Sequence, residues 1–404
     1  MSNTTELTTP EGMSGTGAGS VRSPFRNWLA VAAVAVGTFS VVTTEMLPVG
    51  LLTSIGSALG VSPGTAGLAM TVPGVVAAVA APLLTVAAGR IDRRRLLIGL
   101  LGLLAAANLL SAAAPGFAVL LFARILVGVS IGGVWSIAAG LAARLVPEKS
   151  VGHATSVVFS GIAVASVVGV PAGTLIGDLV HWRAAFAVMA ALSLAVAAAL
   201  AVTLPPLPAD RAIRLAEVPG LFRNARLRTG LITTLLVVTG HFCAYTYIRP
   251  VLEEVSGVET GLISTLLLAY GVAGIAGNFL AGATAHRDPR RTLMVIFTLL
   301  AVAELLVPLV GGTTPGATVL LLLWGLAYGG VSVTSQTWVL QAVPEPGARE
   351  AASALFVGVF NVAISLGALL GGRAADGIGV SSVMWFGGVL AVLALVNVAV
   401  ARRR

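Results

Sequence analysis

Three charged side chains stand out well inside long apolar stretches of this sequence, where a lipid bilayer would make a charge costly and where such residues are usually retained for function. Glu45 lies near the end of the apolar stretch 28–52, and Arg124 lies near the start of the stretch 118–142. If both stretches are membrane helices, the two residues lie roughly 10 Å below the same membrane surface. If the two helices are neighbours, a carboxyl and a guanidinium at one depth form a proton-coupling pair, in which Glu45 binds the proton and Arg124 stabilises the deprotonated carboxylate.

Each of these charged residues also has a simpler interpretation. Glu45 could be a helix-end carboxyl that reaches outer water, and Arg124 could be a structural tie to backbone carbonyls. The third charge, Glu304, lies at a similar depth in the stretch 292–311. For Glu304 we favour a structural interpretation, in which the carboxyl snorkels towards water or is hydrogen-bonded to a neighbour.

The amino-acid composition indicates that these apolar stretches lie in a membrane. The 404 residues are 57% hydrophobic and 10% charged, with a mean hydropathy of +0.98, which is typical of a multi-span helical membrane protein. The net charge of +8 does not indicate nucleic-acid binding, because the basic residues occur in short clusters beside apolar stretches. Cys243 is the only cysteine and the four histidines are scattered, so we expect no disulfide framework, no metal site and no cofactor, and we do not expect an enzyme.

Twelve apolar stretches are long enough to cross a bilayer as helices. They are 28–52, 66–87, 96–114, 118–142, 154–179, 184–204, 229–251, 261–283, 292–311, 317–340, 351–373 and 383–401. With both termini in the cytoplasm, 20 of the 24 basic residues lie in inner segments, as the positive-inside rule requires. This topology predicts a disordered cytoplasmic tail at 1–27, a six-helix bundle at 28–204, a cytoplasmic linker at 205–228 and a second six-helix bundle at 229–401.

The two predicted bundles resemble each other in sequence. Three sets of residues recur at an offset of 196 to 198 positions, which is hard to obtain by chance even in a glycine-rich chain. The pairs are Asp92 with Asp288, Gly128, Gly132 and Gly133 with Gly325, Gly329 and Gly330, and Gly169, Gly173 and Asp178 with Gly367, Gly371 and Asp376. Such parallel repeats predict a substrate site between two halves that rock about it.

Several motifs resemble those of one transporter family. They are TEMLPVGLL at 44–52, FARILVGVSIGGVWS at 122–136, GVPAGTLIGDLVHWRAAF at 169–186, GHFCAYTYIRP at 240–250 and FVGVFNVAISLGALLGG at 356–372. Over about residues 26–401 the chain resembles the twelve-helix drug/proton antiporter branch of the major facilitator superfamily, and within it the bacterial chloramphenicol and sugar (arabinose-type) efflux proteins. The resemblance implies an all-α membrane fold of two pseudo-symmetric bundles, in which the helices that carry Glu45 and Arg124 line one cavity. It further implies a monomer in the lipid bilayer of the bacterial inner membrane, powered by protons.

Two segments resemble the gating motifs of this family. In the loop GRIDRRR, Asp92, Arg93 and Arg95 match residues that lock helix ends together on the cytoplasmic side, although Ala88 and Arg94 replace two glycines of the motif. The alternative is a positive-inside anchor with no gating role.

The second segment, 161–177, resembles the antiporter motif, with Gly169, Pro171 and Gly173 as its gating residues. In the family motif a glycine directly precedes the proline, whereas here Val170 lies between Gly169 and Pro171. The alternative here is a generic packing face of small residues.

Six side chains are candidates for substrate binding because the resemblance places their helices around the central cavity. They are Trp135, His241, Tyr245, Gln336, Trp338 and Asn361. Aromatic faces and neutral hydrogen-bonding groups suit uncharged or weakly polar molecules. Each residue could equally serve in packing or as an interfacial anchor. His241 and Tyr245 are four residues apart on one predicted helix face, and His241 is the second candidate for proton coupling.

These observations predict an antiporter that exports small neutral or amphipathic molecules by alternating access, with chloramphenicol-like drugs first and drug resistance as the consequence. Sugar or nucleoside efflux by the same mechanism is the alternative. A membrane enzyme or a non-transporting membrane sensor of the same fold is a competing class. The expected partners are a small-molecule substrate, protons and lipid.

Overall fold

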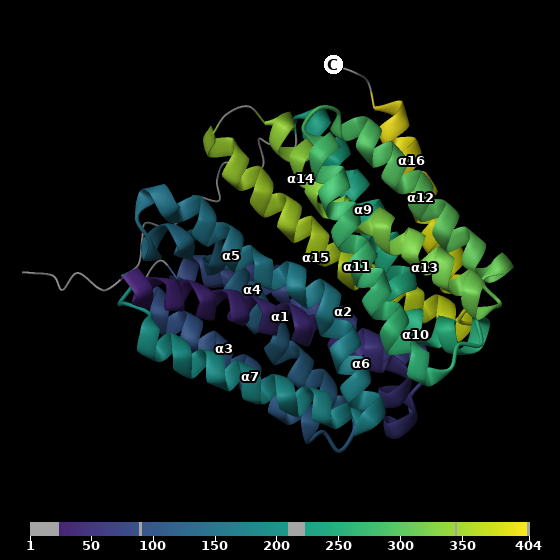
Figure 1. The fold of residues 1–404 in the computed structure, drawn as a ribbon, viewed down its shortest axis with the longest axis horizontal. Coiled ribbons are helices and arrows are strands. Elements are labelled where there is room, and N and C mark those ends of the chain that lie inside the picture. Colours follow the sequence, from purple (N-terminus) through teal and green to yellow (C-terminus); the bar gives the residue numbers. More distant parts are fainter. Residues whose placement is uncertain (1–23, 89–90, 209–222, 344–345, 402–404) are drawn as a thin grey trace, which may run out of the picture.

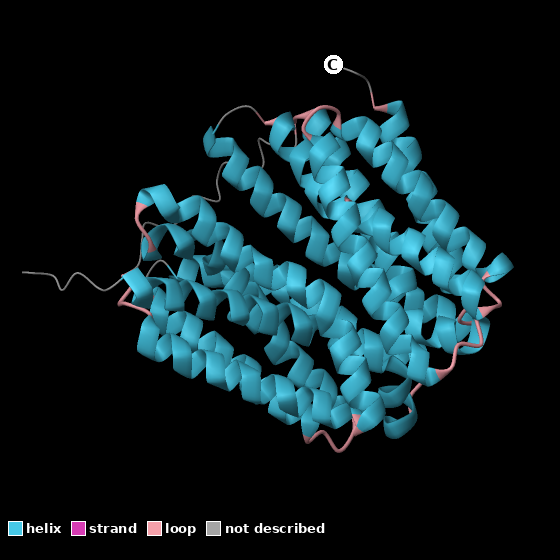
Figure 2. Cartoon of the chain, viewed as in Figure 1, coloured by secondary structure: helices cyan, strands magenta, loops and turns pink. Residues whose placement is uncertain are grey.

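A computed structural model describes residues 24–88, 91–208, 223–343 and 346–401. These segments are helices joined by short loops and contain no strand (Figure 2). The predicted tail at 1–27 lies almost wholly outside the described residues, as does most of the predicted linker at 205–228.

The described helices include twelve that are long and apolar enough to span a membrane, which confirms the predicted number. The first half contains α1 (Pro24–Leu59), α2 (Pro63–Ala88), α3 (Arg93–Ala112), α4 (Phe117–Leu145), α5 (Val151–Val164), the π-helical turn η2 (Ala165–Gly169), α6 (Val170–Leu179) and α7 (Trp182–Thr203). The second half contains α9 (Ala225–Tyr245), α10 (Ile248–Pro250), the π-helical turn η4 (Val251–Val255), α11 (Thr260–Ala285), α12 (Pro289–Val310), α13 (Thr314–Gly329), α14 (Val331–Ala342), α15 (Pro346–Gly377) and α16 (Ser382–Val400).

Three of the predicted spans are interrupted rather than continuous. The fifth span passes from α5 through η2 into α6, and Pro171 follows the π-helical turn, because proline has no N–H to continue an α-helical pattern. The tenth span is interrupted at Gly330, between α13 and α14. The seventh span ends as a regular helix at Tyr245 and continues as short turns that contain Pro250. Apolar length alone does not reveal such breaks.

The helices form two groups, α1–α7 and α9–α16, which lie side by side and come together towards the labels α6 and α10 (Figure 1). The repeats predicted from sequence have matching contacts in the two groups. A methyl group at Gly132 of α4 would lie 2.9 Å from the Ala77 carbonyl oxygen of α2. A methyl group at Gly329 of α13 would meet the carbonyl of Gly274 of α11. Gly329 and Gly274 each lie 197 residues beyond their counterparts Gly132 and Ala77. Small residues therefore let the same helix pairs approach closely in both halves.

Polar contacts join the two groups at one end of the molecule, which we call the closed end. Arg249 of α10 is 3% exposed and donates to the Gly50 carbonyl of α1 at 2.7 Å and to Asp178 of α6 at 2.8 Å. Thr53 of α1 donates to Glu253 of η4 at 2.7 Å.

A second set of contacts at the closed end involves the sequence repeat of Asp178. Asp376 of α15 accepts hydrogen bonds from the Ser62 hydroxyl at 2.6 Å and from the Gly64 N–H at 2.8 Å, both beside the start of α2. The two pseudo-equivalent aspartates therefore each bind the opposite half.

The opposite end carries the segments on either side of the linker, and we call it the linker end. Here the Arg93 N–H donates to the Leu207 carbonyl at 2.9 Å within the first half. Asn224 donates to the Ala342 carbonyl at 2.8 Å within the second half. These contacts brace each half separately and do not cross between them.

Candidate functional site

Glu45 and Arg124 are buried in the first half, on α1 and α4. Glu45 is 5% exposed and Arg124 is 0% exposed. Arg124 Nη1 donates to the Thr44 carbonyl at 2.9 Å, and its guanidinium carbon lies 5.0 Å from the centre of the Phe186 ring. Asn108 of α3 donates to the Thr44 hydroxyl at 3.0 Å. The backbone tie considered for Arg124 therefore exists, and it fixes the guanidinium beside the helix turn that carries Glu45.

Three other side-chain atoms of this pair have no hydrogen-bond partner among the described residues. Glu45 Oε1 and both Arg124 Nε and Nη2 are buried and unpartnered. The two side chains interact electrostatically, yet no nitrogen–oxygen separation between them is as short as 4.0 Å. The two groups of opposite charge therefore have unused hydrogen-bond donors and acceptors, which a proton, water or substrate could bind.

One alternative for Glu45 is wrong. It was considered as a helix-end carboxyl that reaches outer water, on the expectation that the first helix ends at residue 52. The helix α1 instead continues to Leu59, two turns further, and the side chain is almost fully buried. Pro48 does not end the helix, because a proline within a membrane helix is tolerated where neighbouring groups satisfy the backbone.

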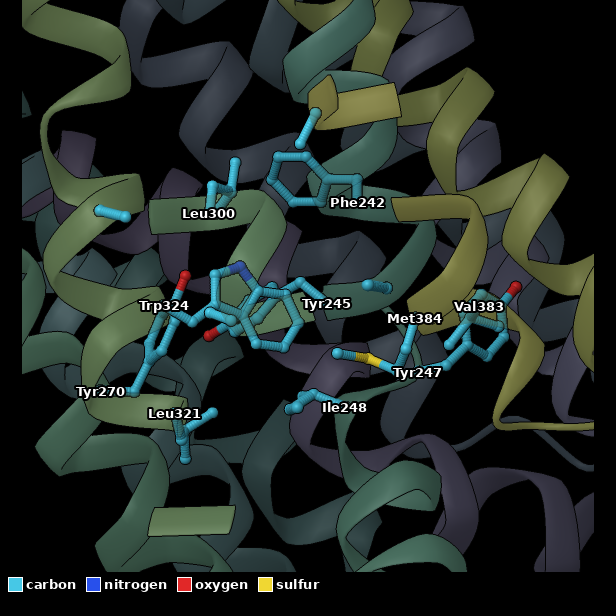
Figure 3. Close-up of a cluster of buried hydrophobic side chains, with 14 of the residues drawn as sticks. Phe242, Tyr245, Tyr247, Ile248, Tyr270, Leu300, Leu321, Trp324, Val383 and Met384 are labelled. Atoms are coloured by element: carbon cyan, nitrogen blue, oxygen red, sulfur yellow. The ribbon is translucent and has the colours of Figure 1, made fainter. Parts of the chain in front are cut away.

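A cluster of aromatic rings fills the centre of the second half. We use the term aromatic cluster for His241 and Tyr245 of α9, Tyr270 of α11, and Trp324 and Tyr328 of α13. The Trp324 indole N–H donates to His241 Nδ1 at 3.0 Å, and the imidazole stacks on Tyr328 with ring centres 3.3 Å apart. Tyr245 stacks on His241 and on Tyr270 at 5.0 Å each. Figure 3 shows Trp324, Tyr245 and Tyr270 gathered together.

The aromatic cluster bears on two predictions. The shared face of His241 and Tyr245 is present as a stacked pair. His241 Nδ1 accepts a hydrogen bond, so that nitrogen carries no proton in this conformation. Sequence reasoning missed Tyr270, Trp324 and Tyr328, because their contacts with α9 join segments that are distant in the sequence.

The other predicted substrate residues make their hydrogen bonds and contacts outside the aromatic cluster. Trp338 is buried, and its indole N–H donates to the Arg226 carbonyl at 2.9 Å. Gln336 contacts the Ser353 hydroxyl at 3.5 Å, and half-buried Trp135 packs against the core of the first half.

Asn361 of α15 is half-buried and donates to the Val357 carbonyl at 2.9 Å. Within the described residues, the contacts join only His241 and Tyr245 of the six predicted substrate residues. The substrate roles remain predictions.

The loop predicted to act as a gate caps a helix in this conformation. Asp92 Oδ1 accepts the Arg95 N–H at 3.1 Å, and Oδ2 accepts the Leu207 N–H at 2.7 Å. The Arg94 guanidinium donates to the Ala201 carbonyl. The loop therefore binds the start of α3 to the end of α7. The gating roles of Asp92, Arg93 and Arg95 remain predictions.

The glycines of the predicted antiporter motif face α1. A methyl group at Gly169 would lie 2.8 Å from the Thr43 hydroxyl, and one at Gly173 would meet the Leu47 side chain. Pro171 is buried between them. The small-residue packing face considered as an alternative is therefore present, and the gating role of these residues remains a prediction.

The interpretation favoured for Glu304 is wrong. Glu304 of α12 is 0% exposed, and within the described part of the chain neither carboxyl oxygen has a hydrogen-bond partner. The side chain points into the second half instead of snorkelling towards water. The predicted depth of Glu304 below the membrane surface was suitable for snorkelling. The side of the helix to which a side chain points is set by packing, which the sequence position does not show.

Comparison with known proteins agrees with this fold. The family described as Major Facilitator Superfamily matches residues 34–348. The chain is 35% identical over 375 residues to the transcription regulatory protein OpdE of Pseudomonas aeruginosa, covering 91% of this chain and 92% of OpdE. It is 33% identical over 377 residues to the purine ribonucleoside efflux pump NepI of Shigella sonnei, covering 93% and 94% respectively.

Two solved structures have the same fold. One is a bacterial homologue of the human lysosomal transporter Spinster in an inward-facing and occupied conformation, with a TM-score of 0.76, 17% identity and coverage of 94% of this chain and 97% of that one. The other is the human organic anion transporter MFSD10 (TETRAN), with a TM-score of 0.64, 18% identity and coverage of 93% and 100%. By its family match and its near full-length relatives, this chain belongs to the Major Facilitator Superfamily and is a multi-pass membrane transporter.

Proposed function

We propose that this protein is a proton-coupled exporter of small uncharged molecules, with purine ribonucleosides as the first substrates to test. The observation that carries the proposal is the buried pair Glu45 and Arg124, whose unpartnered polar atoms lie in a membrane-spanning bundle. A buried acid without a hydrogen-bond partner is suited to binding and releasing a proton. The export of purine ribonucleosides by a relative of near full length supports the substrate class.

The orientation follows from charge. The positive-inside rule places the linker end, with its arginine-containing loops, in the cytoplasm. The closed end then faces outwards, so that the conformation described here is inward-facing. In this state substrate enters from the cytoplasm, as an exporter requires. We expect the protein to act as a monomer in the bacterial inner membrane.

The coupling cycle uses Glu45 as its proton carrier. In the outward-facing state Glu45 takes up a proton as the substrate leaves, and in the inward-facing state it releases the proton as the substrate enters. Arg124 is held by the Thr44 carbonyl at 2.9 Å, so it remains in place to stabilise the deprotonated carboxylate. Exchange becomes obligatory when the proton and the substrate each weaken the binding of the other.

The substrate class is supported by chemistry as well as by the relative. A purine base offers a flat aromatic face, which stacks on side chains such as half-buried Tyr328. Neutral amides such as Asn361 and Gln336 match the hydroxyls and ring nitrogens of a nucleoside. Chloramphenicol-like drugs and sugars are the alternative substrates.

A second candidate function is regulatory. A relative at 35% identity carries the name of a transcription regulatory protein. A membrane protein of this fold could act in this way by sensing a small molecule without moving it. Transport in a purified system separates the two functions, because a sensor would bind its ligand and not accumulate it.

Inverted membrane vesicles provide the test. We expect vesicles that contain this protein to accumulate a labelled purine ribonucleoside when the interior is acidified, and to lose it when the proton gradient is collapsed. Labelled chloramphenicol and arabinose are measured in parallel to rank the substrate classes. Accumulation of none of the three, in vesicles that contain correctly inserted protein, would refute the proposal and favour a regulator.

A further inference from the structure

Glu304 is a second buried acid, in the half that does not contain Glu45. Both of its carboxyl oxygens are buried without a hydrogen-bond partner among the residues that the structure describes, and the side chain has no exposed surface. No arginine, lysine or histidine among the described residues forms an ion pair with it. An unpaired carboxylate in such a place would lose its hydration without compensation, which costs several kcal/mol in a membrane interior.

The packing around Glu304 is built to admit the carboxyl group. Gly387 of α16 lies against it, because a methyl group at that position would be 2.8 Å from Glu304 Oε2. The same methyl group would lie 3.0 Å from the Gly240 carbonyl and 3.1 Å from the Ala244 side chain of α9. The carboxyl therefore lies where α9, α12 and α16 meet, and a residue without a side chain makes room for it.

The titratable groups that surround Glu304 are weak acids and a neutral imidazole. The carboxyl interacts electrostatically with Cys243 of α9, Tyr270 of α11 and Tyr328 of α13. His241 and Tyr245 belong to the same aromatic cluster, and the Tyr270 hydroxyl is also buried without a partner in the described ranges. The helices α14 and α16, which also pack against α12, contain no titratable residue. None of these neighbours supplies a positive charge.

We propose that Glu304 is a second proton-binding site of this transporter, occupied by a proton when the closed end is shut. The geometry fits a neutral carboxylic acid, since only that form avoids an uncompensated charge beside Gly387 and the aromatic cluster. The ligand of this site is the proton itself. The site is separate from Glu45, which lies on α1 in the other half.

The position of Glu304 links the proton to the conformation. The neighbouring helix α9 leads through Tyr247 to Arg249, which binds Gly50 and Asp178 across the closed end. An outward opening that breaks these bonds moves the end of α9 and changes the packing around Glu304. If the proton binds Glu304 more tightly when the closed end is shut than when it is open, it stabilises the shut state by the difference between the two binding free energies. This part of the inference rests on the proposed proton-driven transport.

Infrared difference spectroscopy of the purified protein tests the site without any transport assay. We expect the carbonyl band of a neutral carboxylic acid at neutral pH, which disappears in Glu304→Gln and also in the similarly sized variant Glu304→Met if the first variant folds poorly. The matched control, Glu254→Gln, removes an exposed acid of η4 and should remove only a carboxylate band.

Two results would overturn the proposal. One is a neutral-acid band that persists unchanged in both Glu304 variants, and the other is loss of a carboxylate band when Glu304 is replaced. The outcome is separable from the proposed function. A neutral-acid band assigned to Glu304, in a protein that accumulates none of the three labelled compounds, would refute the transport proposal and leave the proton site standing.

Discussion

Replacing Asp178 with Asn should loosen the closed end. Asp178 binds Arg249 at 2.8 Å, and the two side chains are 16% and 4% exposed, so the bond is shielded from water. A hydrogen bond to a charged group of this kind contributes about 1.5–3 kcal/mol. Arg249 keeps its bonds to Glu253 and Gly50, so we expect loss of this one contribution. The inward-facing state should therefore become less favoured by roughly 10- to 150-fold relative to the outward-facing state.

Distances between spin labels measure this shift directly. Cys243 is the only cysteine and is buried, so a Cys243→Ala background allows labels at two new cysteines, Ser57→Cys on α1 and Glu254→Cys on η4. We expect Asp178→Asn to add a population with a longer separation. The matched control is Glu259→Gln, which removes an exposed acid at the same end. Equal distance distributions in Asp178→Asn and in the control would refute the reasoning.

Two further predictions concern the packing of the second half. Gly277→Ala should destabilise the protein by about 1–3 kcal/mol, because its methyl group would meet a backbone carbonyl of α13, whereas Gly282→Ala on the same helix meets nothing within 4 Å and should be tolerated. Equal thermal midpoints of the two variants in detergent would contradict this. Trp324→Phe removes the donor to His241 Nδ1 and should lower the thermal midpoint, while Trp385→Phe, at a half-exposed site, should not. A midpoint for Trp324→Phe that matches the Trp385→Phe control would show that this bond adds no stability.

The sequence allowed the fold to be predicted almost completely. Apolar length is a direct consequence of bilayer thickness, so the twelve spans could be counted without a structure. The repeats were also informative, because close helix contacts such as those of Gly132 and Gly329 require small residues in both halves. The breaks at Gly330 and at η2 were missed, since membrane helices contain many glycines and prolines that do not interrupt them.

The candidate site was predictable only in part. The proximity of Glu45 and Arg124 was predicted from their equal depth together with the resemblance, which puts their helices around one cavity. In the structure Arg124 binds the Thr44 carbonyl, next to Glu45, and the coupling role of the pair stays a prediction. The orientation of Glu304 was predicted wrongly, because depth along a helix does not define the side that a residue faces. The aromatic cluster was recognised only on α9, since the contribution of α13 depends on contacts between distant segments.

Proton release on substrate binding tests the central claim most directly. The purified protein in weakly buffered detergent solution, without a gradient, is mixed with a purine ribonucleoside while the pH is recorded. The account predicts that wild-type protein releases protons, and that Glu45→Gln, which keeps the volume and removes the charge change, binds the nucleoside but loses most of the release. Undiminished release from Glu45→Gln would contradict the account, since the coupling proton would then come from another residue.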